Sequence, residues 1–209
     1  MERDLTKTAA YDYQLPKELI AQDPAEPRDS SRLLVVHREN GGTEDRIFRD
    51  ITEYLHPGDL LVMNDTRVLP ARVEGVKKNE GGGAKVEIFF LNPGASGNEW
   101  TALVRPGRKL PEGTRVTLGG ETEVTVGARL EDGLRTIVFA PGDDPLALIH
   151  RFGSTPLPHY ITDSHADPER YQTVYAKREK ENSVAAPTAG LHFTPELLKK
   201  LADMGVPHI

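Results

Sequence analysis

The residues best suited to chemistry lie near the end of the chain, in the run Ser183-Val-Ala-Ala-Pro-Thr-Ala-Gly-Leu-His-Phe-Thr194. Its small residues let a ligand approach the main chain closely. The imidazole of His192 titrates near neutral pH, so His192 is the leading candidate for proton transfer. Thr188, Ala189 and Gly190 are predicted to bind the substrate. The alternative is a tight connector in which His192 only hydrogen-bonds a carbonyl group.

A second polar run, Asn64-Asp65-Thr66-Arg67, follows the short apolar stretch at residues 60–63. Such a stretch predicts a strand buried on both faces, and strands of α/β sheets commonly present ligand-binding groups at their ends. Asp65 suits an ammonium group or ribose hydroxyls, and Arg67 suits a carboxylate or phosphate. Asp65 therefore joins His192 as a candidate catalytic residue, with Asn64, Thr66 and Arg67 as candidate substrate-binding residues. The alternative is that Asp65 and Arg67 satisfy only backbone groups and each other.

A helix is expected directly after the first run, because Thr194 is a good N-cap and Pro195 suits the first helical position. Leucines between residues 197 and 201 share one face, and Gly205 supplies the stop. The free N–H groups at the start of this helix favour an anion beside the imidazole of His192.

Two further helices are predicted after Asp-Pro pairs, one at residues 144–152 and one from Asp167 through Tyr175. Tyr171 and Tyr175 are spaced to share a face of the second helix. Such a pair is more often core packing, but in a cavity it can stack on adenine or an extruded base. Tyr175 is therefore a candidate substrate-binding residue.

From residue 71 to about residue 140, short apolar runs alternate with Gly-rich or Pro-rich breaks. This pattern favours a small barrel. The expected strands lie within residues 85–91, 100–104, 114–118, 124–126 and 134–139, with a hairpin tip at residues 81–83. Upstream, short helices are expected at residues 15–20 and 50–55, and a hairpin at residues 33–48. The predicted fold is α/β: a discontinuous domain, residues 1–70 and 143–209, interrupted by an inserted small antiparallel β-barrel, residues 71–142.

Composition limits the kinds of site and partner. The chain has no cysteine, which excludes disulfides and thiolate metal sites, and no metal site is predicted. No apolar stretch approaches the length that crosses a bilayer, so a cytoplasmic protein without membrane contact is expected. The net charge of −6 disfavours RNA, but residues 72–142 hold ten Lys or Arg against nine Asp or Glu. Arg105, Arg108 and Lys109 cluster there, either in a solvated turn or as phosphate contacts.

Six ordered segments resemble the S-adenosylmethionine:tRNA ribosyltransferase-isomerase family of queuosine biosynthesis. They are residues 20–32, 57–72, 105–109, 156–161, 169–176 and 183–194. The resemblance implies a mixed α/β sandwich into which the barrel is inserted. It also implies an N-terminal fragment, because family members continue into a His-Val-Gly and Gly-Thr-Phe region beyond residue 209.

The resemblance implies an uncommon use of S-adenosylmethionine as co-substrate. The family transfers and isomerises its ribosyl group to a 7-aminomethyl-7-deazaguanine base at the tRNA wobble position, which gives epoxyqueuosine-tRNA, adenine and methionine. This reaction needs a base, an acid and groups that bind the methionine ammonium and carboxylate, but no metal. For this chain the implied partner is tRNA, contacted through Arg105, Arg108 and Lys109, and the expected state is a monomer.

Other functions stay open. A non-catalytic tRNA-binding module would use the barrel as a platform, which its few aromatic residues and net charge of +1 disfavour. An ordinary methyltransferase is disfavoured because no Gly-x-Gly-x-x-Gly follows a strand. A fragment that is inactive without the remaining chain is the third alternative. Release of adenine together with methionine separates the ribosyltransferase from these alternatives.

Overall fold

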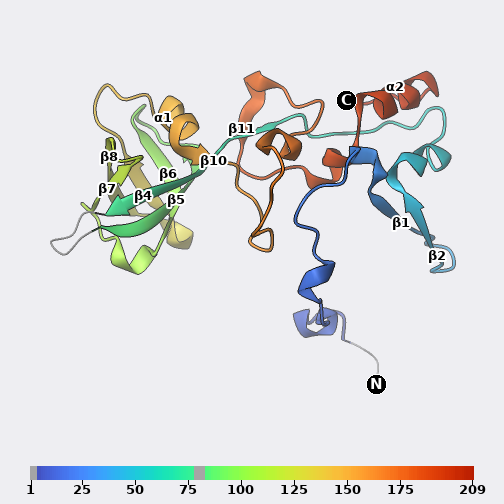
Figure 1. Ribbon diagram of the computed structural model, residues 1–209, viewed down its shortest axis with the longest axis horizontal. Coiled ribbons are helices and arrows are strands. Elements are labelled where there is room, and N and C mark those ends of the chain that lie inside the picture. Colours follow the sequence, from blue (N-terminus) through green and yellow to red (C-terminus); the bar gives the residue numbers. More distant parts are fainter. Residues whose placement is uncertain (1–3, 78–82) are drawn as a thin grey trace.

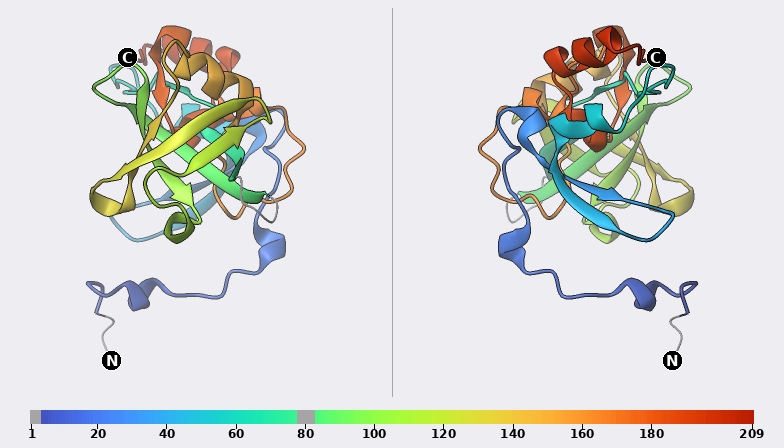
Figure 2. Two further views of the ribbon diagram at one scale, coloured as in Figure 1. Left: turned by 90° about the vertical axis from the view of Figure 1, so that its left-hand side faces the viewer. Right: turned by 90° about the vertical axis from the view of Figure 1, so that its right-hand side faces the viewer.

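The computed structural model describes residues 4–77 and 83–209. The molecule is elongated, with a β-barrel at one end and a β-hairpin with a helix at the other (Figure 1). The segment that follows the barrel runs between these two ends. The first described residues, from residue 4 onward, extend away from the body, as the side views also show (Figure 2). None of the described helices is long and apolar enough to cross a membrane.

Six antiparallel strands close into the barrel because the first of them pairs with strands on both sides. Alternate side chains point inward, as in the middle of the strand at residues 84–93, where Val86, Ile88 and Phe90 are buried. The five expected strands are confirmed. In spatial order the strands are β4 (Arg72–Lys77), β5 (Ala84–Pro93), β6 (Glu99–Arg105), β9 (Arg135–Val138), β8 (Thr122–Arg129) and β7 (Arg115–Leu118).

Two 3₁₀ turns, η5 (Gly107–Lys109) and η6 (Glu131–Gly133), connect barrel strands. The predicted hairpin tip at residues 81–83 falls largely outside the described residues. The predicted helix after Asp144 is confirmed as α1 (Pro145–Phe152), whose first turn is capped by the Asp144 carboxylate. Ile149 of α1 belongs to the apolar core of the barrel.

The chain leaves the barrel beside the point at which it enters. Strand β10 (Gly153–Ser154) pairs antiparallel with the start of β4. A Cβ atom on Gly153 would lie 1.8 Å from the carbonyl oxygen of Pro70, so only glycine permits this approach. The segments on either side of the barrel are therefore held together.

The opposite end of the molecule has its own core, formed where α2 (Pro195–Asp203) packs near the hairpin of β1 (Arg32–Val36) and β2 (Thr43–Ile47). The expected cap and stop are confirmed: Thr194 Oγ1 accepts a hydrogen bond from Leu197, and Gly205 has a φ of +83°. The predicted hairpin is confirmed as well. The buried members of this core are Phe48, Phe193, Leu197, Leu198, Leu201 and Val206.

The rest of this half consists mainly of 3₁₀ turns and short parallel pairing. The expected upstream helices exist only as 3₁₀ helices, η2 and η4. The remaining elements are η1 (Thr8–Tyr11), η2 (Lys17–Leu19), η3 (Arg28–Ser30), η4 (Phe48–Glu53), η7 (Pro168–Tyr171), η8 (Arg178–Lys180), η9 (Thr188–His192) and the parallel pair β3 (Arg67–Val68) and β11 (Glu181–Ser183).

The prediction of a strand buried on both faces at residues 60–63 is wrong. Leu60 and Val62 are 55% and 80% exposed, and only their neighbours Leu61 and Met63 pack against the second core. The stretch forms a single parallel bridge, between Leu61 and His208. Only one of its faces is covered, so an apolar run here does not indicate a central strand.

The predicted helix from Asp167 through Tyr175 is also wrong, because only the 3₁₀ turn η7 forms. Gln172 leaves the helical conformation and turns its amide onto Val68. Its Oε1 accepts from the Val68 N–H at 2.9 Å, and its Nε2 donates to the Val68 carbonyl at 2.9 Å. The extended backbone of Gln172 ends the turn, so Tyr171 and Tyr175 do not share a helix face.

Candidate active site

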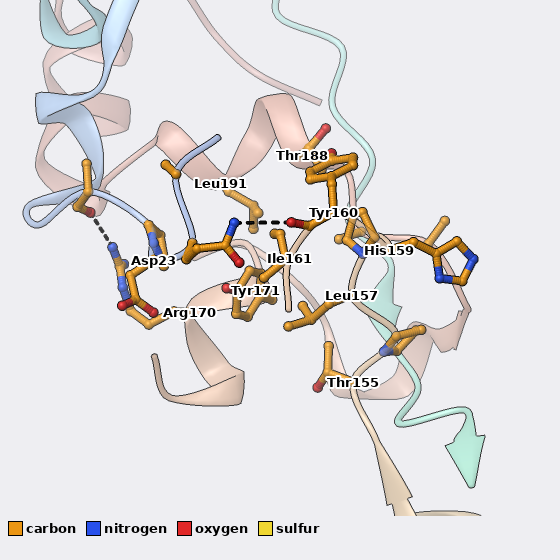
Figure 3. Close-up of a pocket in the computed structure, with 18 of the residues that line it drawn as sticks. Asp23, Thr155, Leu157, His159, Tyr160, Ile161, Arg170, Tyr171, Thr188 and Leu191 are labelled. Carbon is orange, nitrogen blue, oxygen red and sulfur yellow. Dashed lines mark hydrogen bonds between the residues drawn. The ribbon is translucent and has the colours of Figure 1, made fainter. Parts of the chain in front are cut away.

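A cavity of about 760 Å³ opens where segments distant in the sequence meet. Residues 21–32, 155–161 and 184–192 supply most of its wall, and the barrel adds Arg72 and Phe89. Figure 3 shows Asp23 and Arg170 at one end of the cavity and His159 at the other. Its volume lies within the range of about 300–1,000 Å³ usual for small-molecule sites.

The wall combines apolar surface with positive charge. Four arginines line the cavity, and Asp23 is the single carboxylate among the described residues that do so. This balance favours an anionic or planar ligand with apolar faces. The arginines are Arg28, Arg32, Arg72 and Arg170, and the larger apolar and aromatic residues are Phe89, Leu157, Tyr160, Ile161, Tyr171 and Leu191.

His192 lies on η9 and lines this cavity, as does Thr188. The His192 Nδ1 atom is 3.0 Å from the hydroxyl oxygen of Ser31, and its ring centroid is 5.1 Å from that of Phe48. Burial lowers the pKa of His192, which favours the neutral imidazole that accepts a proton. The geometry is therefore compatible with proton transfer, which stays a prediction.

The neighbouring candidates Ala189, Gly190 and Tyr175 are not among the residues that line the cavity. Gly190 is buried, and a Cβ atom there would lie 2.0 Å from the hydroxyl oxygen of Tyr175. Burial raises the pKa of that hydroxyl. Gly190 is therefore needed for packing against Tyr175 behind η9, whereas Ala189 is exposed. Their predicted contact with substrate has no support in this arrangement.

No residue of the second polar run lines the cavity that His192 lines. Lys180 and Lys177 contact the Asp65 carboxylate at 2.7 and 3.0 Å and hold the pKa of Asp65 below its usual range. The Asn64 side chain accepts a hydrogen bond from the Thr66 N–H. Asp65 and these two neighbours line neither described cavity. The two candidate catalytic residues therefore do not line one described cavity.

Arg67 does not pair with Asp65, contrary to the alternative considered from sequence. It pairs instead with Glu169 and, at 3.6 Å from its Nε atom, with Glu181. These side chains line a second cavity of about 360 Å³.

The predicted RNA-contacting residues Arg105, Arg108 and Lys109 lie exposed in and beside η5. The Nη2 atom of Arg105 is 3.3 Å from Nε2 of His159, which lines the 760 Å³ cavity. The turn therefore lies next to one end of that cavity.

The family described as "Queuosine biosynthesis protein" matches residues 8–209. The chain belongs to this family. An S-adenosylmethionine:tRNA ribosyltransferase-isomerase from Moorella thermoacetica is 51% identical over 198 residues, which are 94% of this chain and 56% of the relative. One from Dehalococcoides mccartyi is 52% identical over 205 residues, 96% of this chain and 57% of the relative.

A crystal structure of S-adenosylmethionine tRNA ribosyltransferase from Thermotoga maritima shares 39% sequence identity with this chain, at a TM-score of 0.37. The match covers 95% of this chain and 56% of that chain. The chain thus spans a little more than half the length of these relatives. The family resemblance inferred from six segments is confirmed.

Within this member of the queuosine biosynthesis family, sequence reasoning missed the side chain that organises the cavity wall. The partly buried Arg28 donates through its guanidinium to four backbone carbonyls, those of Glu169, Arg170, Gln172 and Leu191, at 2.9–3.3 Å. Burial lowers the pKa of Arg28. Its sequence signal was its place in a resembling segment, because an arginine between a proline and an aspartate otherwise indicates a solvated position.

Gln22 and Asp23 were also missed, because their contacts are with residues far away in the sequence. Gln22 donates to the Tyr160 carbonyl at 3.1 Å and accepts from the Thr162 N–H at 2.8 Å. One oxygen of Asp23 accepts from the Ser164 hydroxyl and from backbone N–H groups of the same loop, which lowers the pKa of Asp23. Two walls of the cavity are therefore joined by these side chains. In residues 4–77 and 83–209, no three His, Asp or Glu side chains are arranged to hold a metal ion.

Proposed function

We propose that this protein transfers and isomerises the ribosyl group of S-adenosylmethionine to a 7-aminomethyl-7-deazaguanine base at a tRNA wobble position, with release of adenine and methionine. The observation that carries the proposal is the cavity that His192 and Thr188 line together with arginines and aromatic side chains. Relatives that are about half identical in sequence carry the name of this activity. No metal takes part in the proposed reaction.

We assign proton transfer to His192. The step removes a proton from the carbon beside the sulfonium, and the carbanionic carbon so formed goes on to build the rearranged ring. The imidazole nitrogen receives that proton, and adenine leaves with a proton of its own supplied by an acid in the cavity. A lowered pKa suits His192 to the first of these tasks because it keeps the imidazole unprotonated near neutral pH. Asp65, held by two lysines, anchors Lys177 and Lys180 in this proposal.

The RNA partner is proposed to approach from the barrel. Arg105 reaches His159 at the edge of the cavity, and Arg108 and Lys109 lie exposed in the same turn. Phosphates bound there would place an extruded base between apolar and aromatic cavity walls. In this arrangement the protein acts as a cytoplasmic monomer, in which residues 1–70 and 143–209 form one domain and the barrel at residues 71–142 is inserted into it.

The test is incubation of the 209-residue chain with S-adenosylmethionine and a stem-loop that bears the aminomethyl base, followed by chromatography for adenine and methionine. The Dehalococcoides mccartyi relative is the positive control. Both products are expected in equal amounts. If the relative releases adenine and this chain does not, the activity is not a property of this chain. If the chain nonetheless binds the stem-loop, the non-catalytic tRNA-binding alternative is favoured.

The His192→Asn variant tests the assigned role. Single-turnover adenine release should slow by on the order of 10²-fold, while S-adenosylmethionine affinity changes little, because only the titratable group is removed. His56→Asn, at an exposed histidine remote from both cavities, is the matched control. Near-normal release by His192→Asn would assign this histidine to the scaffold.

Replacement of Arg105, Arg108 and Lys109 by alanine tests the RNA contact. Each phosphate contact contributes nearly one unit to the slope of log affinity against log salt concentration, so the slope should fall by up to about three units. Affinity for S-adenosylmethionine should not change. An unchanged salt slope would remove this turn from the RNA-binding surface.

A further inference from the structure

The second cavity, of about 360 Å³, adjoins the first. Three segments line both: residues 67–72, 168–172 and 181–186. On the 168–172 segment, Glu169 and Gln172 line the second cavity, whereas Arg170 and Tyr171 line the first. Thr155 lines both. The two cavities are therefore neighbouring parts of one site, with Thr155 at their junction.

The charges of the two cavities differ. The first has four arginines and one carboxylate, whereas the second has both signs in close contact. In the second cavity, Arg67 pairs with Glu169 and Glu181, and Nε2 of His150 lies 2.8 Å from the other oxygen of Glu181. The side chains of Arg67 and Glu181 are only 18% and 19% exposed. These charges are therefore partly desolvated, which makes an unpaired one costly.

The backbone fixes this ion-pair network. Arg67 and Glu181 are direct partners in the parallel pair β3–β11. The Gln172 amide holds the next residue of β3, Val68, through both of its backbone groups. Arg67 and Glu181 are thus placed by main-chain contacts before any ligand arrives, as preorganised binding groups are.

A zwitterion fits such a network better than a simple ion does. A lone anion that binds Arg67 displaces carboxylates and leaves them unpaired, and a lone cation does the same to Arg67. A ligand with adjacent ammonium and carboxylate groups exchanges one set of ion pairs for another without changing the net charge. An α-amino acid group has this arrangement, and a guanidinium binds its carboxylate in bidentate fashion.

We propose that the second cavity binds the α-amino-acid end of the sulfonium substrate: Arg67 binds the carboxylate, Glu181 and Glu169 bind the ammonium, and the nucleoside end occupies the first cavity. This inference rests on the proposed function for the identity of the substrate.

The experiment compares two ligands by isothermal titration calorimetry: S-adenosylmethionine, and 5′-methylthioadenosine, which lacks the amino-acid end. Glu181→Gln should weaken S-adenosylmethionine binding by about tenfold or more, because a charge-assisted bond to the ammonium is lost. Binding of 5′-methylthioadenosine should stay within about twofold of the unaltered chain. Glu121→Gln, at an exposed ion pair on the barrel, is the matched control and should change neither ligand.

Two further measurements keep the test decisive. Glu169→Gln alters an exposed carboxylate, so it keeps the fold if Glu181→Gln does not, and it should affect the two ligands in the same selective way. Arg67→Lys should weaken S-adenosylmethionine but not its decarboxylated analogue. Equal weakening of both ligands, unchanged S-adenosylmethionine affinity, or no S-adenosylmethionine binding by the unaltered chain would overturn the proposal.

The outcome is separable from that of the proposed reaction. If the selective pattern appears but no adenine is released with the stem-loop, the binding site stands and the proposed reaction fails. If adenine is released without the selective pattern, this inference fails alone.

Discussion

The barrel and the cavity region are stabilised in different ways. In the barrel, neighbouring strands satisfy each other's backbone groups, and inward-facing apolar side chains fill a closed core. In the cavity region, individual polar side chains satisfy backbone groups: Arg28 binds four carbonyls, and Gln22 and Gln172 each bind both donors and acceptors. Many similar contacts hold the barrel, whereas few specific ones hold the cavity. Substitutions should therefore act differently in the two regions.

The largest effect is expected in the barrel core at Phe90. Its ring is fully buried, 6.0 Å from the Trp100 ring and 5.7 Å from the Phe139 ring between centroids. Phe90→Ala should lower the free energy of unfolding by about 3–5 kcal/mol. Urea unfolding followed by Trp100 fluorescence measures this loss, because Trp100 is the single tryptophan. Leu103→Ala, on the outer face of the same barrel, should cost much less.

A somewhat smaller and more local effect is expected at Arg28. Arg28→Met keeps an apolar stem but removes the guanidinium from four carbonyls, which should cost about 2–3 kcal/mol. Hydrogen exchange should rise in residues 160–172 and stay unchanged in the barrel strands. Arg32→Met, which removes only an exposed ion pair with Asp45, is the control. Equal loss of protection in the barrel would show that the two regions unfold as one unit.

Gln172→Ala should cost about 1–2 kcal/mol, because it leaves the buried backbone groups of Val68 without their partners. Thermal unfolding and the exchange rate of the Val68 amide measure this effect. Gln172→Glu keeps the acceptor but places a carboxylate opposite the Val68 carbonyl, so it should not restore stability. Full stability of either variant would contradict the view that single polar side chains hold this region.

The smallest effect concerns pH. Burial holds the folded-state pKa of His192 below its ordinary value of 6.5, so the unfolded chain binds more protons as pH falls below about 6.5. This histidine therefore lowers stability as pH drops through that window, and its contribution levels off once the folded imidazole is also protonated. Unfolding curves between pH 7.5 and 5.5 should show a shallower pH dependence for His192→Asn. An identical pH dependence would place His192 in a solvent-like environment.

The contrast between the regions also explains what the sequence could predict. Alternation of apolar and polar residues in segments such as residues 85–91 indicates a half-buried strand without reference to the rest of the chain. The barrel was therefore predictable from sequence. The caps at Asp144 and Thr194 are equally local signals, and both are confirmed. The turn at Gln172 was not predictable, since its conformation depends on Val68, more than a hundred residues away.

In the candidate site, too, some residues could be identified from local sequence and others only from the folded chain. His192 and Thr188 were identified from a small-residue run and do line the cavity. Gly190 belongs to the same run, but a glycine is needed there because the hydroxyl of Tyr175 leaves no room for a side chain. Arg28 and Glu181 carry no local signal, because each lies among other charged residues and such a stretch is usually a solvated surface. Their importance comes from partners that only the folded chain brings within reach.

Because β10 pairs with the first residues of β4, the two chain crossings that join the barrel to the rest of the protein lie side by side. A module attached in this way can be lengthened, shortened or exchanged without moving the framework that carries it, since its two ends need only stay adjacent. The close approach of Gly153 to Pro70 makes that junction stiff. The outer loops of such a barrel can therefore vary while the junction, and the cavity segments that lie outside the barrel, keep their geometry.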